Sequence, residues 1–321
     1  MTPLSRSSQP TTKFTTRSDN LTDPVILFGE VLADVFPDRT VLGGAPFNVA
    51  RHLKAFGLNP VLITRLGKDG LRDDILQVMS QHGMEVTGIQ FDDNHPTGQV
   101  KVHIDGTSHR FEILPLQAYD FIHPIELDEN TLPTHPALVY FGTLAQRHEI
   151  SRLALDTLLD STPEAEKFMD INLRTPWYNQ SILHKSLQRA NIVKLNDDEL
   201  GILVNMFMLA GNKPEAQILD LLNRFNIEQA IMTCGKNGAW QISSSGEIIK
   251  TGKNENAVKL VDTVGAGDGF AAVYMLGSLL RWPIKTTLVR ANAFASSICA
   301  IRGAIPGNAD FYIPFIQEWK V

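Results

Sequence analysis

The sequence predicts an α/β fold in which a mostly parallel sheet is flanked by helices on both faces. Apolar runs of strand length recur along the chain, and stretches of helical length lie between them. Repeated strand–helix units with fully apolar strands are typical of doubly wound parallel sheets. One central segment instead alternates apolar and polar residues, which predicts a small second sheet with one exposed face.

The first elements form a strand–helix–strand unit. Residues 24–32 and 59–67 are apolar runs of strand length. Between them, residues 45–57 carry apolar side chains at helical spacing and end at Gly57, a helix stop signal. We therefore expect two parallel strands joined by a helix.

The middle of the chain predicts the accessory sheet. Residues 98–114 alternate apolar and polar side chains around the turn sequence "DGTS", as a β-hairpin does. We expect residues 31–42 to join this hairpin. Together they would form a small accessory sheet.

The rest of the chain returns to the strand–helix alternation. The expected strands are 137–144, 167–173, 191–196 and 229–235, the expected helices include 197–209, 215–225, 267–281 and 285–302, and a second hairpin is expected at 238–252. Sites in such sheets lie at the carboxyl ends of the strands, which directs attention to the residues after Leu32, Leu173 and Leu195 and around Gly265.

Length and composition limit the domain organisation and the classes of partner that we expect. The 321 residues fit one large domain with an appendage or two domains. Residues 1–22 are rich in Ser and Thr without apolar periodicity, which predicts a disordered tail before a folded domain at 23–321. The net charge of −6 argues against a nucleic-acid partner, and no apolar run reaches the length of a membrane span. Two cysteines are too few for a disulfide framework, so we expect a cytoplasmic protein.

The stretch "VDTVGAGDGF" (261–270) is the strongest local signal. It lacks the Gly-Lys-Ser/Thr end of a P-loop, and Phe270 stands where the dinucleotide fingerprint has its last glycine. A glycine turn that opens a helix can bind an anion through its backbone N–H groups, and Asp268 could accept a proton from an attacking hydroxyl. Taken alone, the stretch fits equally well a helix start whose acid complements the helix dipole by about 0.3–1 kcal/mol.

Two segments carry a resemblance to a known family. "DTVGAGD" (262–268) resembles the C-terminal signature of the ribokinase-like (PfkB) carbohydrate kinases, and "GGAPFNVARHLKAFG" (43–57) resembles their N-terminal signature. The segments occur in the family's order, and the resemblance covers roughly 24–316. It implies a doubly wound, ribokinase-like domain with a small β-sheet lid over the sugar, formed by residues 31–42 and 98–114.

The resemblance implies roles at the sugar and at the transferred phosphoryl group. Asp268 matches the catalytic base, and Gly265, Ala266 and Gly267 match the anion hole. Asp34 matches an acid that binds sugar hydroxyls, Gly43 and Gly44 match positions of close approach to the sugar, and Asn48 matches a sugar-contacting amide.

The resemblance also implies binding sites for ATP and metal ions. Asn196 and Glu199 match the N-x-x-E motif, which holds Mg²⁺ and its waters, so both are expected to act through water. Thr233 and Gly235 match the loop that contacts the triphosphate, and Asn292 occupies a place near the adenine. A K⁺ site would use carbonyls of Asp262 and Val264, with Ile298, Ile301 and Gly303 opposite.

The segment "MDINLRTPWY" (169–178) resembles fructokinases within the family and makes D-fructose the expected substrate. Arg174 is expected to touch the sugar or the γ-phosphate, Phe111 to cover the sugar, and Phe47 to add bulk beside it. Ribose, a 2-keto-3-deoxy sugar acid or a nucleoside are the alternative substrates, and a non-catalytic sugar or nucleotide sensor is a further alternative. We also expect that the lid can pair across a homodimer.

Overall fold

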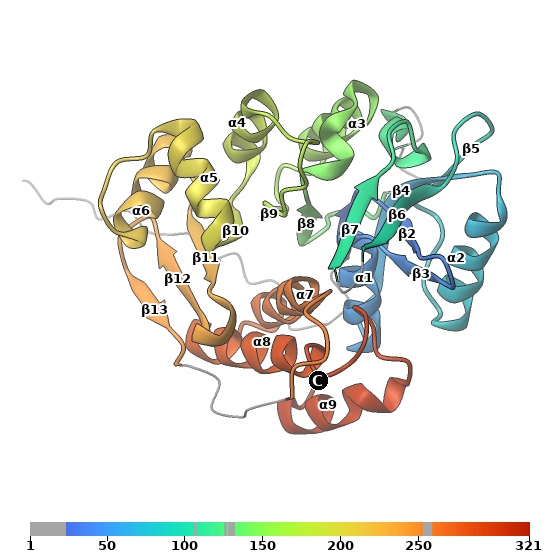
Figure 1. The fold of residues 1–321 in the computed structure, drawn as a ribbon. Helices are drawn as coiled ribbons and strands as arrows, with labels where there is room; N and C mark the ends of the chain where they lie inside the picture. Colours follow the sequence, from blue (N-terminus) through green and yellow to red (C-terminus); the bar gives the residue numbers. More distant parts are fainter. Residues whose placement is uncertain (1–23, 106–107, 125–126, 128–131, 253–258) are drawn as a thin grey trace, which may run out of the picture.

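The main feature of the molecule is a nine-stranded sheet (Figure 1). The computed structural model describes residues 24–105, 108–124, 127, 132–252 and 259–321. The strand order is β13-β12-β11-β10-β9-β8-β1-β4-β5. The strands are β1 (Val25–Phe28), β4 (Pro60–Gly67), β5 (Ile89–Asp92), β8 (Leu138–Phe141), β9 (Glu166–Asp170), β10 (Ile192–Asn196), β11 (Gln229–Thr233), β12 (Ala239–Ser243) and β13 (Ile248–Lys250).

The sheet is parallel except at one edge. Strands β5, β4, β1, β8, β9, β10 and β11 pair in parallel. The predicted hairpin at 238–252 forms the antiparallel edge β12–β13. The chain order reverses beside β1, which has β4 on one side and β8 on the other. Ligand sites of open α/β sheets lie at such a reversal.

Helices cover both faces of the sheet, as Figure 1 shows. One layer, packed in one apolar core, contains α1 (Ala45–Ala55), α2 (Gly70–Gln81), α7 (Ala266–Leu279), α8 (Ile284–Ile298) and α9 (Ile313–Trp319). The other layer, packed in the opposite core, contains α3 (Glu149–Ser161), α4 (Gln180–Arg189), α5 (Asp197–Phe207) and α6 (Pro214–Phe225). Single 3₁₀ turns occur at Ala118–Phe121, Leu144–Arg147, Gly235–Asn237 and Ala309–Tyr312.

Strand β1 illustrates why an unbroken apolar run suits this position. Successive side chains of a strand point to opposite faces. Val25 and Leu27 are buried in the core with α7, whereas Ile26 and Phe28 are buried in the core with α3. A strand between two helical layers therefore needs apolar residues at every position, which confirms the predicted fold class.

A second sheet of four strands lies beside the main one. Its order is β3-β2-β6-β7, formed by β2 (Leu32–Val35), β3 (Thr40–Gly43), β6 (Gly98–Asp105) and β7 (Ser108–Ile113). Strands β2 and β6 pair in parallel, and each pairs with its chain neighbour in antiparallel fashion. The two segments predicted to form an accessory sheet thus come together; two residues of the predicted turn, 106–107, lie outside the described residues.

The predicted single strand at 24–32 is wrong, because the run is divided between the two sheets. Strand β1 ends at Phe28, and β2 begins at Leu32. Gly29 has φ +148°, and a Cβ there would lie 2.7 Å from Cγ of Pro46. Hydrophobic content alone did not reveal that this glycine turns the chain toward the lid.

The remaining predicted helices and strands are present in the structure, but most of them begin or end at other residues than predicted. The strands predicted at 137–144, 167–173 and 229–235 end two or three residues earlier in the structure, whereas the strand predicted at 191–196 ends at Asn196 as expected. The predicted tail lies outside the described residues. Within the described part, no helix has both the length and the apolar character needed to cross a membrane. Cys234 and Cys299 are both free thiols.

Candidate active site

A cavity of about 950 Å³ lies between the lid, the carboxyl edge of the main sheet and the first turn of α7. This volume is at the upper end of the roughly 300–1,000 Å³ typical of small-molecule sites. The predicted residues that line it are Asp34, Gly43, Gly44, Asn48, Phe111, Arg174, Asn196, Glu199, Thr233, Gly235, Val264, Gly265, Ala266, Gly267, Asp268 and Asn292. Residues that are distant in sequence are therefore brought to one place. Of the other residues given a role from sequence, Gly303 lines the cavity as well, whereas Phe47, Asp262, Ile298 and Ile301 do not.

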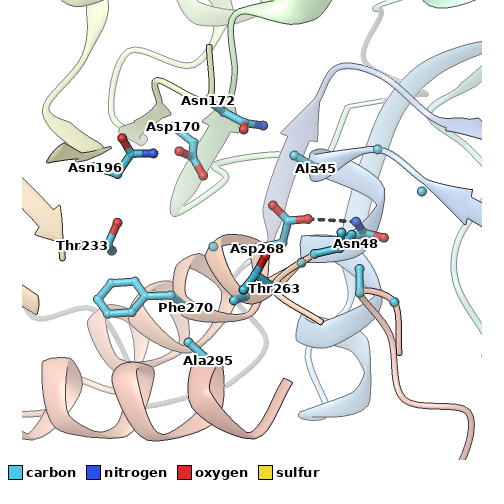
Figure 2. Close-up of a pocket in the computed structure, with 18 of the residues that line it drawn as sticks. Ala45, Asn48, Asp170, Asn172, Asn196, Thr233, Thr263, Asp268, Phe270 and Ala295 are labelled. Atoms are coloured by element: carbon cyan, nitrogen blue, oxygen red, sulfur yellow. Dashed lines mark hydrogen bonds between the residues drawn. The ribbon is translucent and has the colours of Figure 1, made fainter. Parts of the chain in front are cut away.

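Asp268 lies in the first turn of α7 and faces the cavity (Figure 2). Its Oδ2 accepts a hydrogen bond of 2.8 Å from Nδ2 of Asn48, on α1. Burial raises the pKa of Asp268 to about 6, partly opposed by the Asn48 hydrogen bond. A carboxylate with this pKa is ionised at neutral pH and is a stronger base than an exposed aspartate.

The glycine turn before Asp268 requires its glycine. Gly265 has φ +78°, and a Cβ there would lie 2.2 Å from Cβ of Ala304. The N–H of Ala266 donates to the carbonyl of Thr263 over a long 3.3 Å. Among the described residues, the N–H groups of Gly267 and Asp268 have no backbone acceptor, so these two amides are free to bind an anion.

The lid end of the cavity contains Asp34, Gly43, Gly44 and Phe111. Burial raises the pKa of Asp34 to about 6, and the positive charge of Arg174 opposes this rise. A Cβ on Gly44 would lie 2.5 Å from the carbonyl oxygen of Glu30, which explains why this position needs glycine. Phe111 is 52% exposed although it lines the cavity, so a ligand could bury its ring.

The prediction that Phe47 adds bulk beside the sugar is wrong. Its side chain is fully buried in the core with α7 and α8 and does not line the cavity. The guanidinium of Arg51 stacks over its ring at 5.5 Å. Because Phe47 is on α1, its side chain follows the apolar face of that helix into the core.

Asn196 and Glu199 form a capping box at the start of α5. Oδ1 of Asn196 accepts from the N–H of Glu199, and Oε2 of Glu199 accepts from the N–H of Asn196, both at 2.9 Å. Oε1 of Glu199 accepts from the N–H of Leu173. Backbone hydrogen bonds thus hold these three side-chain oxygens in place at the cavity wall. Within the described residues no group of three or more His, Cys, Asp or Glu side chains could hold a metal ion.

The nucleotide side of the cavity is formed by strand ends and α8. Thr233 ends β11, and Gly235 follows with φ +51° and open space at its Cβ position. Asn292 faces the cavity from α8. Figure 2 shows Thr233 and Asn196 on the strand side, across from Ala295 and Phe270 on the helices.

Asp262 connects the glycine turn to the loop after α8. Its Oδ1 accepts from the N–H of Val264, and its Oδ2 accepts from the N–H of Gly303. The predicted K⁺ site is thus a place where two loops meet. The carbonyl of Ile298 is engaged by the N–H of Ile301, and the buried Ile298 side chain belongs to the core.

Four charged residues of the cavity wall were not predicted from sequence: Glu30, Asp170, Lys194 and Lys236. Burial raises the pKa of Glu30 to about 7, and its Oε1 accepts from the N–H of Ala45 at 3.3 Å. The bond caps α1, whose first residue has no other side-chain cap. Asp170 and Lys194 lie within apolar strands, and Glu30 lies two residues after β1, so a charge in an apolar run was the available signal for these three. Lys236 lies in the turn Gly235–Asn237 and had no such signal.

The comparisons with known proteins agree with this geometry. The pfkB family carbohydrate kinase model matches residues 18–310. The chain belongs to this family of carbohydrate kinases. Both signatures identified from sequence, at 43–57 and 262–268, lie within the match.

Several known proteins match nearly the whole chain. A fructokinase of Salmonella typhimurium is 28% identical over 311 residues, covering 92% of this chain and 97% of the relative. A fructokinase structure from Vibrio cholerae O395, with fructose, ADP and calcium ion bound, has a TM-score of 0.76 at 22% identity and covers 92% of this chain and 99% of that one. A 2-dehydro-3-deoxygluconokinase structure from Thermotoga maritima has a TM-score of 0.79 at 16% identity, covering 92% and 98%. Fructokinases and a sugar-acid kinase are therefore both within the range of similarity.

Proposed function

We propose that this carbohydrate kinase transfers the γ-phosphate of ATP to a primary hydroxyl of a sugar, and that the sugar is D-fructose. The observation that carries the proposal is Asp268, a carboxylate with a pKa of about 6 whose own backbone amide and that of Gly267 have no backbone acceptor among the described residues. One turn then supplies both a base and an anion-binding site, which are the requirements of phosphoryl transfer.

In the proposed reaction, the hydroxyl oxygen of the sugar attacks the γ-phosphorus, and Asp268 accepts the hydroxyl proton. The amides of Gly267 and Asp268 stabilise the charge that develops on the transferred group. Asn48 orients the base through its 2.8 Å bond. Asp34 binds sugar hydroxyls, since a carboxylate can accept from two neighbouring groups. The lid residue Phe111 excludes water over the sugar.

Metal ions complete the proposal. Mg²⁺ bound with ATP would neutralise phosphate charge, and Asn196 and Glu199 would hold its waters. Thr233 and Gly235 would contact the triphosphate, and Asn292 would lie near the base. A K⁺ ion at the carbonyls of Asp262 and Val264 would add a positive charge beside the anion hole.

The balance of charge at the sugar end favours a neutral sugar such as fructose over a sugar acid. Asp34 and Glu30 are acidic groups in this part of the wall, and Arg174 is an exposed cation at its rim. Hydroxyl-rich neutral sugars suit carboxylate acceptors, whereas a sugar acid would place its own carboxylate near them.

The test is an ADP-release assay with Mg²⁺ and K⁺ and a panel of fructose, ribose, 2-keto-3-deoxygluconate and adenosine. We expect kcat/KM for fructose to exceed the other values by about tenfold or more. A strong preference for another sugar would replace fructose but keep the phosphoryl-transfer site. No release with any of them would favour a non-catalytic sensor.

Two further proposals concern the whole protein. We propose that the lid sheet pairs with a second copy to form a homodimer, which sedimentation velocity would detect as a doubled mass. We also propose a cytoplasmic location, supported by the two free thiols, and fractionation of cells that produce the full chain would test it.

A further inference from the structure

The cavity wall contains a buried ion pair that has no role in the phosphoryl transfer as proposed. Asp170 is the last residue of β9, Lys194 is on β10, and the two are paired residues in the parallel register. Nζ of Lys194 lies 2.9 Å and 3.0 Å from the two carboxylate oxygens of Asp170. The hydroxyl of Tyr140 also donates to Asp170, at 3.2 Å. The carboxylate is therefore held in place from two sides.

A buried ion pair with a purely structural role costs free energy, because both charges must leave water. The side chains of Lys194 and Asp170 are only 7% and 2% exposed. Removing two charges from water costs several kcal/mol per ion, and well-packed apolar residues often stabilise a protein as much or more. A buried ion pair in the wall of an active-site cavity thus invites a functional explanation.

The position of the ammonium supplies that explanation. A Cβ built on Gly267 would lie 3.5 Å from Nζ of Lys194, so the ammonium is in contact range of the glycine turn. The N–H of Gly267 is one of the two free amides. The only charge that the proposed transfer adds at this place is negative, on the phosphoryl oxygens.

Lys194 remains protonated. Burial alone would lower its pKa, but the carboxylates of Asp170 and Glu199 outweigh this effect, and its pKa is raised. An ammonium that stays charged can stabilise an anion but cannot serve as a proton acceptor.

We propose that Lys194 is a catalytic residue that donates a hydrogen bond from its ammonium to the transferred phosphoryl group, and that Asp170 is a positioning residue that holds the ammonium against the glycine turn. The inference rests on the proposed phosphoryl transfer. The bond from the sugar oxygen to the γ-phosphorus forms while the bond to the β,γ-bridging oxygen breaks, and ADP leaves with that electron pair. The hydroxyl proton passes to Asp268, and Lys194 keeps its protons throughout.

The experiment compares Lys194→Met and Lys194→Arg with a control, Lys167→Met. Lys167 is near the start of β9, where its Nζ bonds to the carbonyl of Pro163 and does not line the cavity. We expect Lys194→Met to lower kcat by about 10²–10³-fold, the usual effect of losing one anion-hole donor. KM for the sugar should change by less than about threefold, since the contact is made in the transition state. Lys194→Arg should recover part of kcat, and the control should match the wild type.

A binding measurement separates catalysis from folding. ADP with aluminium fluoride mimics the transferred group, whereas ADP alone does not. We expect Lys194→Met to bind ADP normally but to lose most of the extra affinity that aluminium fluoride confers on the wild type. Because Lys194→Met leaves Asp170 unpaired, the Lys194→Met/Asp170→Leu variant removes both charges and should show the same losses in a folded protein.

Three outcomes would decide against the inference. A folded Lys194→Met protein with kcat within about threefold of the wild type overturns it while the proposed function stands. Equal losses of ADP and ADP–aluminium fluoride affinity overturn it as well, because the lysine would then serve nucleotide binding in general. A wild-type protein that releases no ADP with any sugar overturns the proposed function and this inference together.

Discussion

At the scale of single residues, the site depends on how burial and one hydrogen bond set the basicity of Asp268. Burial raises its pKa to about 6, and the bond from Asn48 moves the pKa in the opposite direction. The structure thus assigns Asn48 a contact that the sequence did not predict, since its amide had been expected to touch the sugar. The same amide leaves its Oδ1 buried without a partner among the described residues, which keeps an acceptor available for a sugar hydroxyl.

The pKa of Asp268 predicts the pH dependence of turnover. A general base acts as the ionised carboxylate, so kcat/KM should rise with pH through about 6 and level off above it. Asn48→Leu removes a hydrogen bond that favours the ionised form, and its midpoint should therefore move to higher pH. The measurement is kcat/KM for the sugar between pH 5 and pH 8. A midpoint that is unchanged in Asn48→Leu would contradict this explanation of the pKa.

At the scale of elements, the start of α7 fixes the anion-binding amides through a glycine that no other residue can replace. Gly265→Ala introduces a Cβ that would overlap Cβ of Ala304, in a backbone conformation of positive φ. We expect kcat to fall by at least about 10²-fold, because the two free amides would shift out of position. The measurement is steady-state ADP release, accompanied by thermal unfolding.

Gly201→Ala is the matched control for this element. Gly201 lies in the interior of α5, with open space at its Cβ position. Replacing a helical glycine with alanine should leave activity unchanged and stabilise the protein by about 0.5–1 kcal/mol. If both variants kept full activity, the glycine turn would have no part in positioning the reaction.

At the scale of the whole molecule, the cavity lies where parts of the chain that are distant in sequence meet. The lid, the edge of the main sheet and α7 all face it. A ligand that binds only the folded protein stabilises it by about 2.7 kcal/mol at a hundred times its Kd. We therefore expect Tm to rise by several degrees with fructose and with Mg·ATP, and not with mannitol at equal concentration. A Tm that responds to mannitol as strongly as to fructose would contradict specific sugar binding.

The fold was largely predictable because it rests on hydrophobic patterning. Unbroken apolar runs distinguish buried strands such as β1, and alternation identifies the lid hairpin. The ends of helices and strands were less predictable. Strand β1, for example, ends at Phe28 because Gly29 turns the chain, and hydrophobic periodicity does not indicate such a backbone conformation.

Site residues that belong to a sequence motif were predictable. Site residues that only the arrangement of the strands brings to the cavity were not. Asp268 and Asn196 stand in recognisable strings, but Lys194 and Glu30 become site residues only because neighbouring strands end at the same edge. Phe47 shows the converse: it is beside Asn48 in sequence, yet the turn of α1 points it into the core.

The most direct test of the central claim is sugar-dependent ADP release by Asp268→Asn beside the wild type. The variant keeps the shape of the side chain but cannot accept the hydroxyl proton, and general bases contribute about 10²–10⁴-fold. We predict that kcat falls by about this factor while ATP affinity stays within about threefold. A folded Asp268→Asn protein with near-normal kcat would contradict the role of Asp268 and with it the proposed mechanism.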